Sequence, residues 1–447
     1  MPRHVTNPVP HPIFQEPVFN EAVVSGDPAG FQQPHPSDND VYKRIEDLLG
    51  KDVVGFEKSR VAPGEIFKLE DALGPRGTDI VGQIAGAGGI VFHALGDSGA
   101  SNSRKYGSEI NVADQLTTDA HSADPSDRPA FLFHLGDVVY DFGESKFYYD
   151  QFYEPFRNYP APIFAIPGNH DSFIVPGTPA GSEPLTIFGR NFCSANPVIT
   201  PEAASLHRTA MIQPGVYFTL DAPFVRVIAL FSNSLEDPGV ISSEQGKWTA
   251  VPDFQLEYLA AQLKRIKDEN YQGAVLLASH HPAFSYAPQD ASGARGNHGC
   301  SSAMLRQIDG ISLDAGVYPH AFLSGHAHNY QRYTRQLTFH GQEMDVPFLV
   351  CGNGGHAANP LVRSRRGQPS LEPFNGSRVD YLEADPAVQT MGLILEKYDD
   401  RNYGYLRISA NKDQLRIGFH QATDQSILQS RYDLVTVDLK SHQMVAN

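Results

Sequence analysis

Residues 136–140 read Gly136-Asp137-Val138-Val139-Tyr140 and follow directly on the short apolar run 130–135. Four other motifs share this form, with polar side chains just after an apolar run: Gly96-Asp97-Ser98-Gly99, Gly168-Asn169-His170-Asp171, Ser279-His280-His281-Pro282 and Gly325-His326-Ala327-His328. Loops at strand ends are where a scaffold presents functional side chains. The five motifs therefore predict one centre assembled from several loops, which is how a two-metal site is built.

Short apolar runs separated by helices and long loops continue from about residue 88 to the end of the chain. Continuous runs of this length suit strands that are covered on both faces. The expected strands are residues 90–95, 130–135, 162–166, 224–231, 274–278, 321–323 and 347–351, a hairpin of 404–408 with 414–420, and 433–439. Helices are expected at 254–268, where Leu256, Leu259, Leu263 and Ile266 have helical spacing, and at 300–308. This alternation predicts an α/β fold.

Residues 1–85 are expected to form an N-terminal extension, and residues 86–447 a single catalytic domain. The first 36 residues are rich in Pro, Asn, Gln and Gly, which favours an extended arm. A short helix is expected at 38–49, where Val41, Ile45 and Leu48 share one face and Gly50 ends the run. No internal repeat or Gly-Ser linker divides residues 88–447.

Composition excludes several classes of protein. The net charge of -16 would repel nucleic acid and an anionic membrane surface. No apolar run approaches the roughly 18 residues that a membrane span needs, so no span is expected. The three cysteines allow at most one internal disulfide.

The first residues lack the apolar core of a signal peptide, so a cytoplasmic location is expected. No P-loop, dinucleotide fingerprint or Gly-x-Ser-x-Gly elbow occurs, which disfavours nucleophilic serine hydrolysis.

The polar residues of the five motifs form a mixed set of metal donors. The candidate ligands are Asp97, Asp137, Tyr140, Asn169, His280, His326 and His328. Oxygen donors alone would indicate magnesium or calcium, whereas carboxylate, phenolate, amide and imidazole together suit iron, manganese or catalytic zinc. His326 and His328 are two residues apart, so in an extended loop they would point to the same side and reach two adjacent metals. Asp137 is the candidate bridging ligand, because a carboxylate has two oxygens.

This ordered set resembles the calcineurin-like metallophosphoesterases and, within them, the purple acid phosphatases. Most of that superfamily has Gly-Asp-x-His as its first motif, and the histidine binds the first metal. Here Gly99 occupies the histidine position, and Tyr140 stands where purple acid phosphatases have a tyrosinate. A phenolate in place of an imidazole favours ferric iron. Leu277 is a mild departure from the Val that the family usually has at this position.

The resemblance implies a fold, a ligand set and a reaction. The fold would be a four-layer sandwich of two mixed β-sheets flanked by helices. The first metal, Fe(III), would be bound by Asp97, Asp137, Tyr140 and His328, and the second, a divalent Fe, Zn or Mn ion, by Asp137, Asn169, His280 and His326. A metal-bound hydroxide would attack the phosphorus of a small-molecule phosphate monoester in line with the leaving oxygen.

Two further histidines are catalytic candidates. His170, next to Asn169, would hydrogen-bond the phosphoryl group or protonate the leaving alcohol. His298 resembles a substrate-side histidine of the small purple acid phosphatases. His281 is expected to support the site rather than bind metal, and His93 and His134 to be satisfied histidines of the core. His356 could line the site, although a glycine-rich strand end explains it equally well.

Three alternatives stay open from the sequence. The protein could be a phosphodiesterase, a manganese- or zinc-dependent phosphatase of the same superfamily, or a protein that binds phosphate esters without useful turnover. Relatives in the superfamily are often secreted, which opposes the cytoplasmic expectation. The motifs do not determine the natural substrate or the oligomeric state.

Overall fold

The structure is a computed structural model of the 447-residue chain. It describes residues 66–446 apart from 123, 173–183, 205, 207, 235–237, 249–250, 286–298, 362–376, 379–391 and 423–429. The helix expected at 38–49 lies outside the described residues. The predicted boundary between residues 85 and 86 stays a prediction. None of the described helices is long and apolar enough to cross a membrane.

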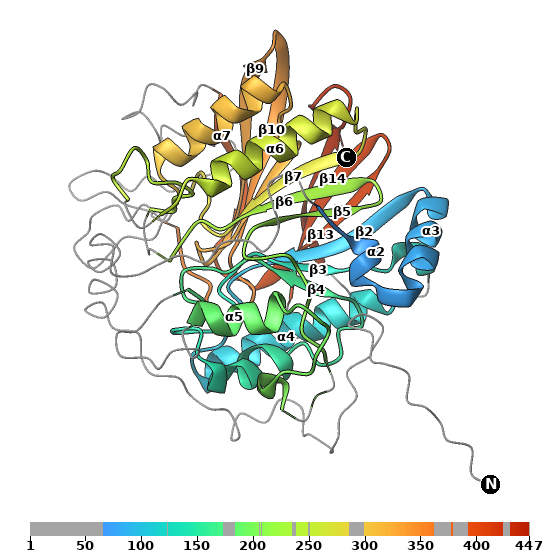
Figure 1. The fold of residues 1–447 in the computed structure, drawn as a ribbon, viewed down its shortest axis with the longest axis vertical. Coiled ribbons are helices and arrows are strands. Elements are labelled where there is room, and N and C mark those ends of the chain that lie inside the picture. Colours follow the sequence, from blue (N-terminus) through green and yellow to red (C-terminus); the bar gives the residue numbers. More distant parts are fainter. Residues whose placement is uncertain are drawn as a thin grey trace.

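Two mixed β-sheets form the centre of the molecule (Figure 1). The larger sheet has nine strands in the order β1-β5-β6-β7-β8-β10-β9-β12-β11. They are β1 (Phe67–Lys68), β5 (Phe218–Ala222), β6 (Val225–Leu230), β7 (Ala274–Ser279), β8 (Ala321–Ser324), β9 (Tyr330–Phe339), β10 (Gln342–Cys351), β11 (Ser377–Arg378) and β12 (Ile394–Asp399). Strands β6, β7, β8 and β10 are parallel to one another, so their carboxyl ends lie at one edge of the sheet.

The second sheet has seven strands in the order β16-β15-β14-β13-β2-β3-β4. They are β2 (Gly89–Leu95), β3 (Leu132–His134), β4 (Ile163–Ala165), β13 (Gly404–Asn411), β14 (Gln414–Gln421), β15 (Ser430–Asp438) and β16 (Gln443–Val445). Strands β2, β3 and β4 are parallel. The Gly96 N–H, just after β2, donates to the Cys351 carbonyl at the end of β10 over 2.9 Å, so the carboxyl ends of the two sheets meet.

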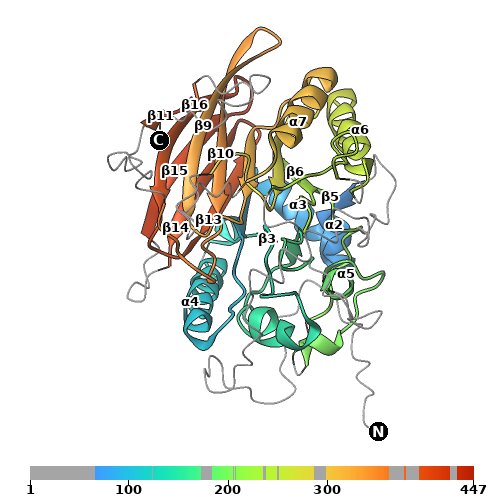
Figure 2. The same cartoon turned by 90° about the vertical axis from the view of Figure 1, so that its left-hand side faces the viewer.

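Helices flank the sheets, mainly to the right of and below the strands in the view of Figure 2. The α-helices are α2 (Leu69–Ala72), α3 (Gly77–Ala87), α4 (Ser103–Ala120), α5 (Pro184–Phe192), α6 (Phe254–Asp268) and α7 (Ser302–Ala315). Shorter helical segments are Gly74–Arg76, Pro125–Asp127, Ser145–Phe147, Tyr149–Tyr153 and Pro201–Ala203. Helix α6 packs on α7 and on β6, whereas α4 packs on β13 of the other sheet. The predicted α/β fold of two mixed sheets with flanking helices is confirmed.

The apolar side chains of both sheets join into one buried core. In the smaller sheet, the rings of Phe92 and Phe131 stack at 4.6 Å between centroids, and Phe164 meets Phe131 edge-on at 5.6 Å. Aromatic pairs of this kind contribute about 0.5–1.5 kcal/mol beyond the area they bury. This packing fixes β2, β3 and β4 relative to one another, and each of these strands leads into one of the polar motifs.

Candidate metal centre

The five motifs occupy loops at the carboxyl ends of parallel strands from both sheets. Asp97, Asp137 and Asn169 follow β2, β3 and β4 of the smaller sheet. His280 follows β7 of the larger sheet, and the segment with His326 and His328 connects β8 to β9. Because these strand ends meet, the structure brings all seven candidate ligands together, as the sequence predicted. Their role as ligands stays a prediction.

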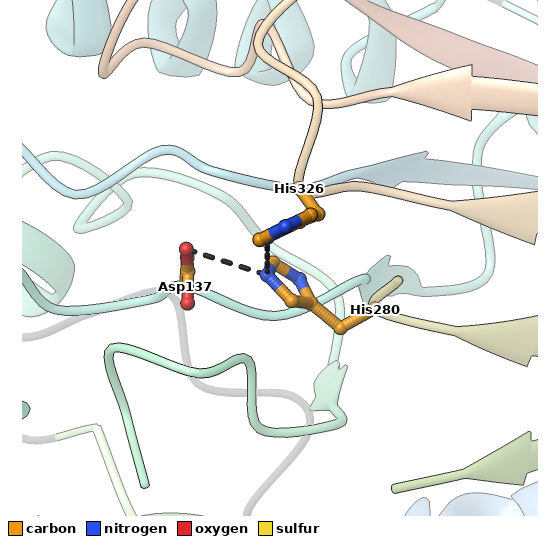
Figure 3. Close-up of side chains that lie close together, drawn as sticks. All are labelled: Asp137, His280 and His326. Atoms are coloured by element: carbon orange, nitrogen blue, oxygen red, sulfur yellow. Dashed lines mark hydrogen bonds and ion pairs between the residues drawn. The ribbon is translucent and has the colours of Figure 1, made fainter. Parts of the chain in front are cut away.

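Four side chains form a first cluster of donor atoms. His280 Nε2 lies 3.0 Å from Asn169 Oδ1 and 3.3 Å from Asp137 Oδ2. His326 Nδ1 lies 3.1 Å from Asn169 Oδ1 and 3.2 Å from His280 Nε2. Figure 3 shows Asp137, His280 and His326 pointing toward one another. All four side chains are buried.

The protonation of His280 makes this cluster fit a cation. Its Nδ1 lies 2.9 Å from the Leu135 carbonyl oxygen, to which it must donate. In a neutral ring, Nε2 then carries a lone pair, which faces the oxygens of Asn169 and Asp137. Buried acceptors that face one another are unfavourable unless a proton or a metal ion lies between them. The mixed nitrogen and oxygen donors suit a transition metal or zinc.

The pKa of His280 also indicates that this cluster favours a positive charge. Burial alone would lower this pKa, but the Asp137 carboxylate outweighs burial and raises it to about 9. Burial likewise opposes ionisation of Asp137, yet His280 and His170 hold the Asp137 pKa well below its ordinary value. The Asp137 carboxylate that raises the His280 pKa would attract a metal cation at the same position.

A second cluster shares Asp137 with the first. The Tyr140 hydroxyl lies 2.9 Å from Asp137 Oδ2, 3.2 Å from Asp97 Oδ1 and 3.2 Å from His328 Nε2. His328 Nε2 is also 3.3 Å from Asp97 Oδ1. The potential ligand atoms of Asp97, Asp137 and His328 lie within 4.8 Å of one another, and so do those of Asp137, His280 and His326. Two adjacent donor sets with one common carboxylate are the arrangement that a bridged metal pair needs.

The loops reach this arrangement through unusual backbone conformations. Asp97, Asp137 and His326 have φ values of 58°, 56° and 66°, which residues other than Gly rarely adopt. Such conformations persist where the surrounding structure enforces them, often at functional sites. Glycine next to each aspartate or asparagine allows the loops to approach closely: a Cβ on Gly168 would lie 2.1 Å from Asp137 Oδ1, and one on Gly136 would lie 2.6 Å from His280 Nδ1.

Two supporting residues were not assigned from the sequence. The Asp171 carboxylate accepts backbone N–H groups of Val138, Val139 and Gly168 at 3.0 Å, and so ties the loop after β3 to the loop after β4. Gln151 forms two hydrogen bonds with the backbone of Tyr140, at 2.8 and 2.6 Å. Asp171 belongs to a recognisable motif, whereas no local pattern marks Gln151.

The remaining candidate histidines, His170, His281 and His298, differ in their position relative to the donor clusters. His170 donates its backbone N–H to Asp137 Oδ1 over 2.9 Å, and its ring lies 4.2 Å from that of Tyr140. His281 lies 2.8 Å from Ser232 Oγ and packs on His326, outside both donor clusters. His298 lies outside the described residues, and its predicted role is untested.

His93 and His134 are confirmed as satisfied core histidines. His93 Nε2 is 2.7 Å from Asp119 Oδ2, and its Nδ1 is 3.1 Å from the Tyr159 hydroxyl. His134 Nε2 is 2.9 Å from Ser98 Oγ. Both rings are buried, so neither histidine is available to a substrate.

The chain matches a known family of proteins. The family described as calcineurin-like phosphoesterase matches residues 92–330, a stretch that includes all seven candidate ligands and His170. Among solved structures, "GAP50 the anchor in the inner membrane complex of Plasmodium" is similar at 12% identity and a TM-score of 0.47, over 77% of this chain and 88% of that chain. "Structure of PhoD" is similar at 12% identity and a TM-score of 0.47, over 86% of this chain and 73% of that chain. No curated protein matches. Since the family match covers more than half of the chain, the protein belongs to the calcineurin-like phosphoesterase family.

Proposed function

We propose that this protein is a phosphatase of the purple acid phosphatase type that hydrolyses phosphate monoesters at a pair of metal ions, Fe(III) and a divalent ion. The observation that carries the proposal is the position of Tyr140, whose hydroxyl lies between Asp97, Asp137 and His328. Gly99 leaves no histidine at the usual position of the first motif. A tyrosinate next to two carboxylates favours a trivalent ion over a divalent one.

In this proposal, Asp97, Asp137, Tyr140 and His328 bind Fe(III), while Asp137, Asn169, His280 and His326 bind a divalent Fe, Zn or Mn ion. When bound, such a pair supplies a nucleophile at neutral pH and neutralises the phosphoryl oxygens of the ester. Two carboxylates and one phenolate provide about -3 against roughly +5 from the metals, so the centre would attract a phosphate dianion.

The chain's own residues organise the site in two ways. Asp171 and the glycines hold the loops at close distance, which fixes Asp137. His170 is our candidate to hydrogen-bond the phosphoryl group or to protonate the leaving alcohol. Its backbone N–H binds Asp137, and its Nδ1 donates to the Asp141 carbonyl over 2.7 Å, so the orientation of the imidazole is fixed. A fixed imidazole is expected to transfer a proton faster than a freely rotating one.

Metal analysis, a visible spectrum and ester turnover test the proposal on the same purified protein. Wild type is expected to contain iron, to show a tyrosinate-to-iron(III) band, and to hydrolyse 4-nitrophenyl phosphate faster than bis(4-nitrophenyl) phosphate. Tyr140→Phe should lose the band. Tyr149→Phe removes a nearby phenol that donates to Glu154 instead, and should keep the band.

Other results would select the alternatives. A colourless protein that is active with zinc or manganese would refute the purple assignment and leave phosphoester hydrolysis standing. Preference for the bis-aryl ester would indicate a phosphodiesterase. Binding of both metals without turnover of either ester would indicate a protein that binds phosphate esters only.

A further inference from the structure

Lys105 lies beside the candidate metal centre, although no motif pointed to it. It belongs to the first turn of α4, eight residues after Asp97. The Asn102 side chain caps this helix by accepting the backbone N–H groups of Arg104 and Lys105 at 3.1 and 3.0 Å. The cap fixes where the Lys105 side chain leaves the helix.

His356 binds the Lys105 ammonium and connects it to the centre. Lys105 Nζ donates to His356 Nε2 over 2.6 Å, while His356 Nδ1 donates to the Gly99 carbonyl over 2.7 Å. The His356 backbone N–H donates to the Asp97 carbonyl over 2.9 Å. The imidazole also stacks on the Tyr140 ring, at 3.5 Å between centroids and 22° between planes. His356 is therefore fixed on several sides, and it holds Lys105 in place.

The packing of α4 leaves this arrangement little freedom. A Cβ on Gly355 would lie 2.7 Å from Glu109 Cα on α4 and 2.9 Å from the Ser98 carbonyl oxygen. Glycine at this position thus allows α4, the loop after β2 and the His356 segment to be in direct contact. A shift of the Lys105 backbone relative to the centre would require these segments to move.

The charge of Lys105 has no ion-pair partner among the described residues. Burial lowers the Lys105 pKa, and the Asp141 carboxylate partly offsets that effect without reaching ion-pair distance. His356 is the one hydrogen-bond partner that the described residues provide for Nζ, and it is an uncharged acceptor when the ring is neutral. An ammonium group has three N–H donors, so two remain for a ligand. A half-buried cation without a carboxylate partner is suited to binding an anion.

We propose that Lys105 binds the phosphoryl group of the substrate and favours phosphate monoesters over diesters, with His356 as its positioning residue. The inference rests on the proposed function of the centre as a phosphoesterase. A monoester dianion has one more charge and one more non-bridging oxygen than a diester. Lys105 supplies both the charge and the N–H donors that such an additional oxygen requires.

The experiment compares Lys105→Gln with wild type in the metal-loaded protein. The measurements are kcat/KM for 4-nitrophenyl phosphate and for bis(4-nitrophenyl) phosphate, the Kd of inorganic phosphate by calorimetry, and metal content. Loss of a charge-assisted hydrogen bond predicts that monoester kcat/KM falls and phosphate Kd rises by about 10- to 100-fold. Diester kcat/KM should change less than about threefold and metal content should stay the same.

Three variants serve as controls. Lys105→Arg keeps the charge and should recover most of the phosphate affinity. His356→Ala should raise KM for the monoester more than it lowers kcat, because Lys105 keeps its charge but loses its position. Lys264→Gln removes a lysine that pairs with Asp268 on the exposed side of α6, and should leave all the measured quantities unchanged.

The two proposals can fail separately. Equal losses for both esters, or an unchanged phosphate Kd in Lys105→Gln, would overturn the role of Lys105 while phosphatase activity stands. If wild type hydrolyses neither ester, the phosphatase proposal fails, and the phosphate Kd still tests Lys105. Wild type that is loaded with metal and binds no phosphate would overturn the Lys105 proposal as well.

Discussion

Gly168→Ala tests how closely the two loops of the smaller sheet must approach each other. A Cβ at position 168 would lie 2.1 Å from Asp137 Oδ1, 2.4 Å from its backbone nitrogen and 2.8 Å from its Cγ. Carbon and oxygen atoms that are not bonded need about 3.5 Å, so the Asp137 carboxylate must retreat by more than about 1 Å. The same oxygen accepts the His170 N–H, so that hydrogen bond would lengthen too.

The expected effect on metal binding is large, because metal–ligand distances tolerate only about 0.2 Å. Asp137 belongs to both donor clusters, so its displacement should weaken the binding of both metals. Displacing a ligand should cost at least as much as losing a residue that orients one, which is about 10- to 100-fold in affinity, or about 1.4–2.7 kcal/mol. The assay is calorimetric titration of metal-free protein with zinc, together with metal analysis after dialysis.

Gly310→Ala is the matched control. Gly310 lies inside α7, and a Cβ there would have no atom within 4 Å. This variant should bind metal as wild type does and gain about 0.5–1 kcal/mol in the free energy of unfolding, since alanine favours a helix. If Gly168→Ala is folded by circular dichroism and binds metal with wild-type affinity, metal binding does not require this close approach of the two loops.

Three further predictions concern charge, loop support and acid stability. Asn169→Asp adds a negative charge to the centre, so the Kd of inorganic phosphate should rise; undiminished affinity would contradict the charge balance proposed above. Asp171→Asn replaces one acceptor of the backbone N–H groups by a donor, and should lower the free energy of unfolding by about 1–3 kcal/mol in urea titrations. Ser126→Ala, at an exposed position, is the control. If Asp171→Asn destabilises the protein less than Ser126→Ala does, Asp171 does not tie the two loops together. Burial lowers the pKa of His320 to about 4, so its contribution to stability is complete above pH 6.5 and is lost toward pH 4. From pH 6.5 to 5, wild type should therefore lose about 2 kcal/mol more than His320→Gln, and equal losses would show that His320 does not titrate in this way.

The sequence predicted those parts of the site that single loops determine. Each motif places its polar residues after an apolar run, and parallel strands bring such loops to one edge. The helix expected at 254–268 is observed as α6 (Phe254–Asp268), because four apolar residues repeat at helical spacing without interruption. That two separate sheets contribute to the centre came from the family resemblance and not from the periodicity.

Elements that the sequence did not reveal have polar residues in buried positions. Helix α4 buries Glu109 among Val112, Ala113 and Leu116, which interrupts its apolar face. Strand β9 buries Arg335, whose charge is balanced by Asp309 on α7 at 2.7 Å. In β9 a tertiary contact overrides the alternation that usually identifies a strand, and in α4 a buried carboxylate interrupts the helical periodicity.

Contacts between distant segments were also beyond a reading of the sequence. Lys105 and His356 are 251 residues apart, and their hydrogen bond depends on how α4 packs against the segment after β10. Gln151 supports Tyr140 only because the chain between them turns back on itself. Neither pairing has a spacing rule, so both required the three-dimensional structure.

Anomalous scattering from crystals of the protein loaded with iron and zinc would show most directly whether Tyr140 binds one ion of a metal pair. We predict two peaks about 3.5–4 Å apart. One ion should be bound by Tyr140 with Asp97 and His328, and the other ion by Asn169, His280 and His326, with Asp137 between the two ions. A single peak, or a pair of peaks in which Tyr140 contacts neither metal, would contradict the proposed metal pair.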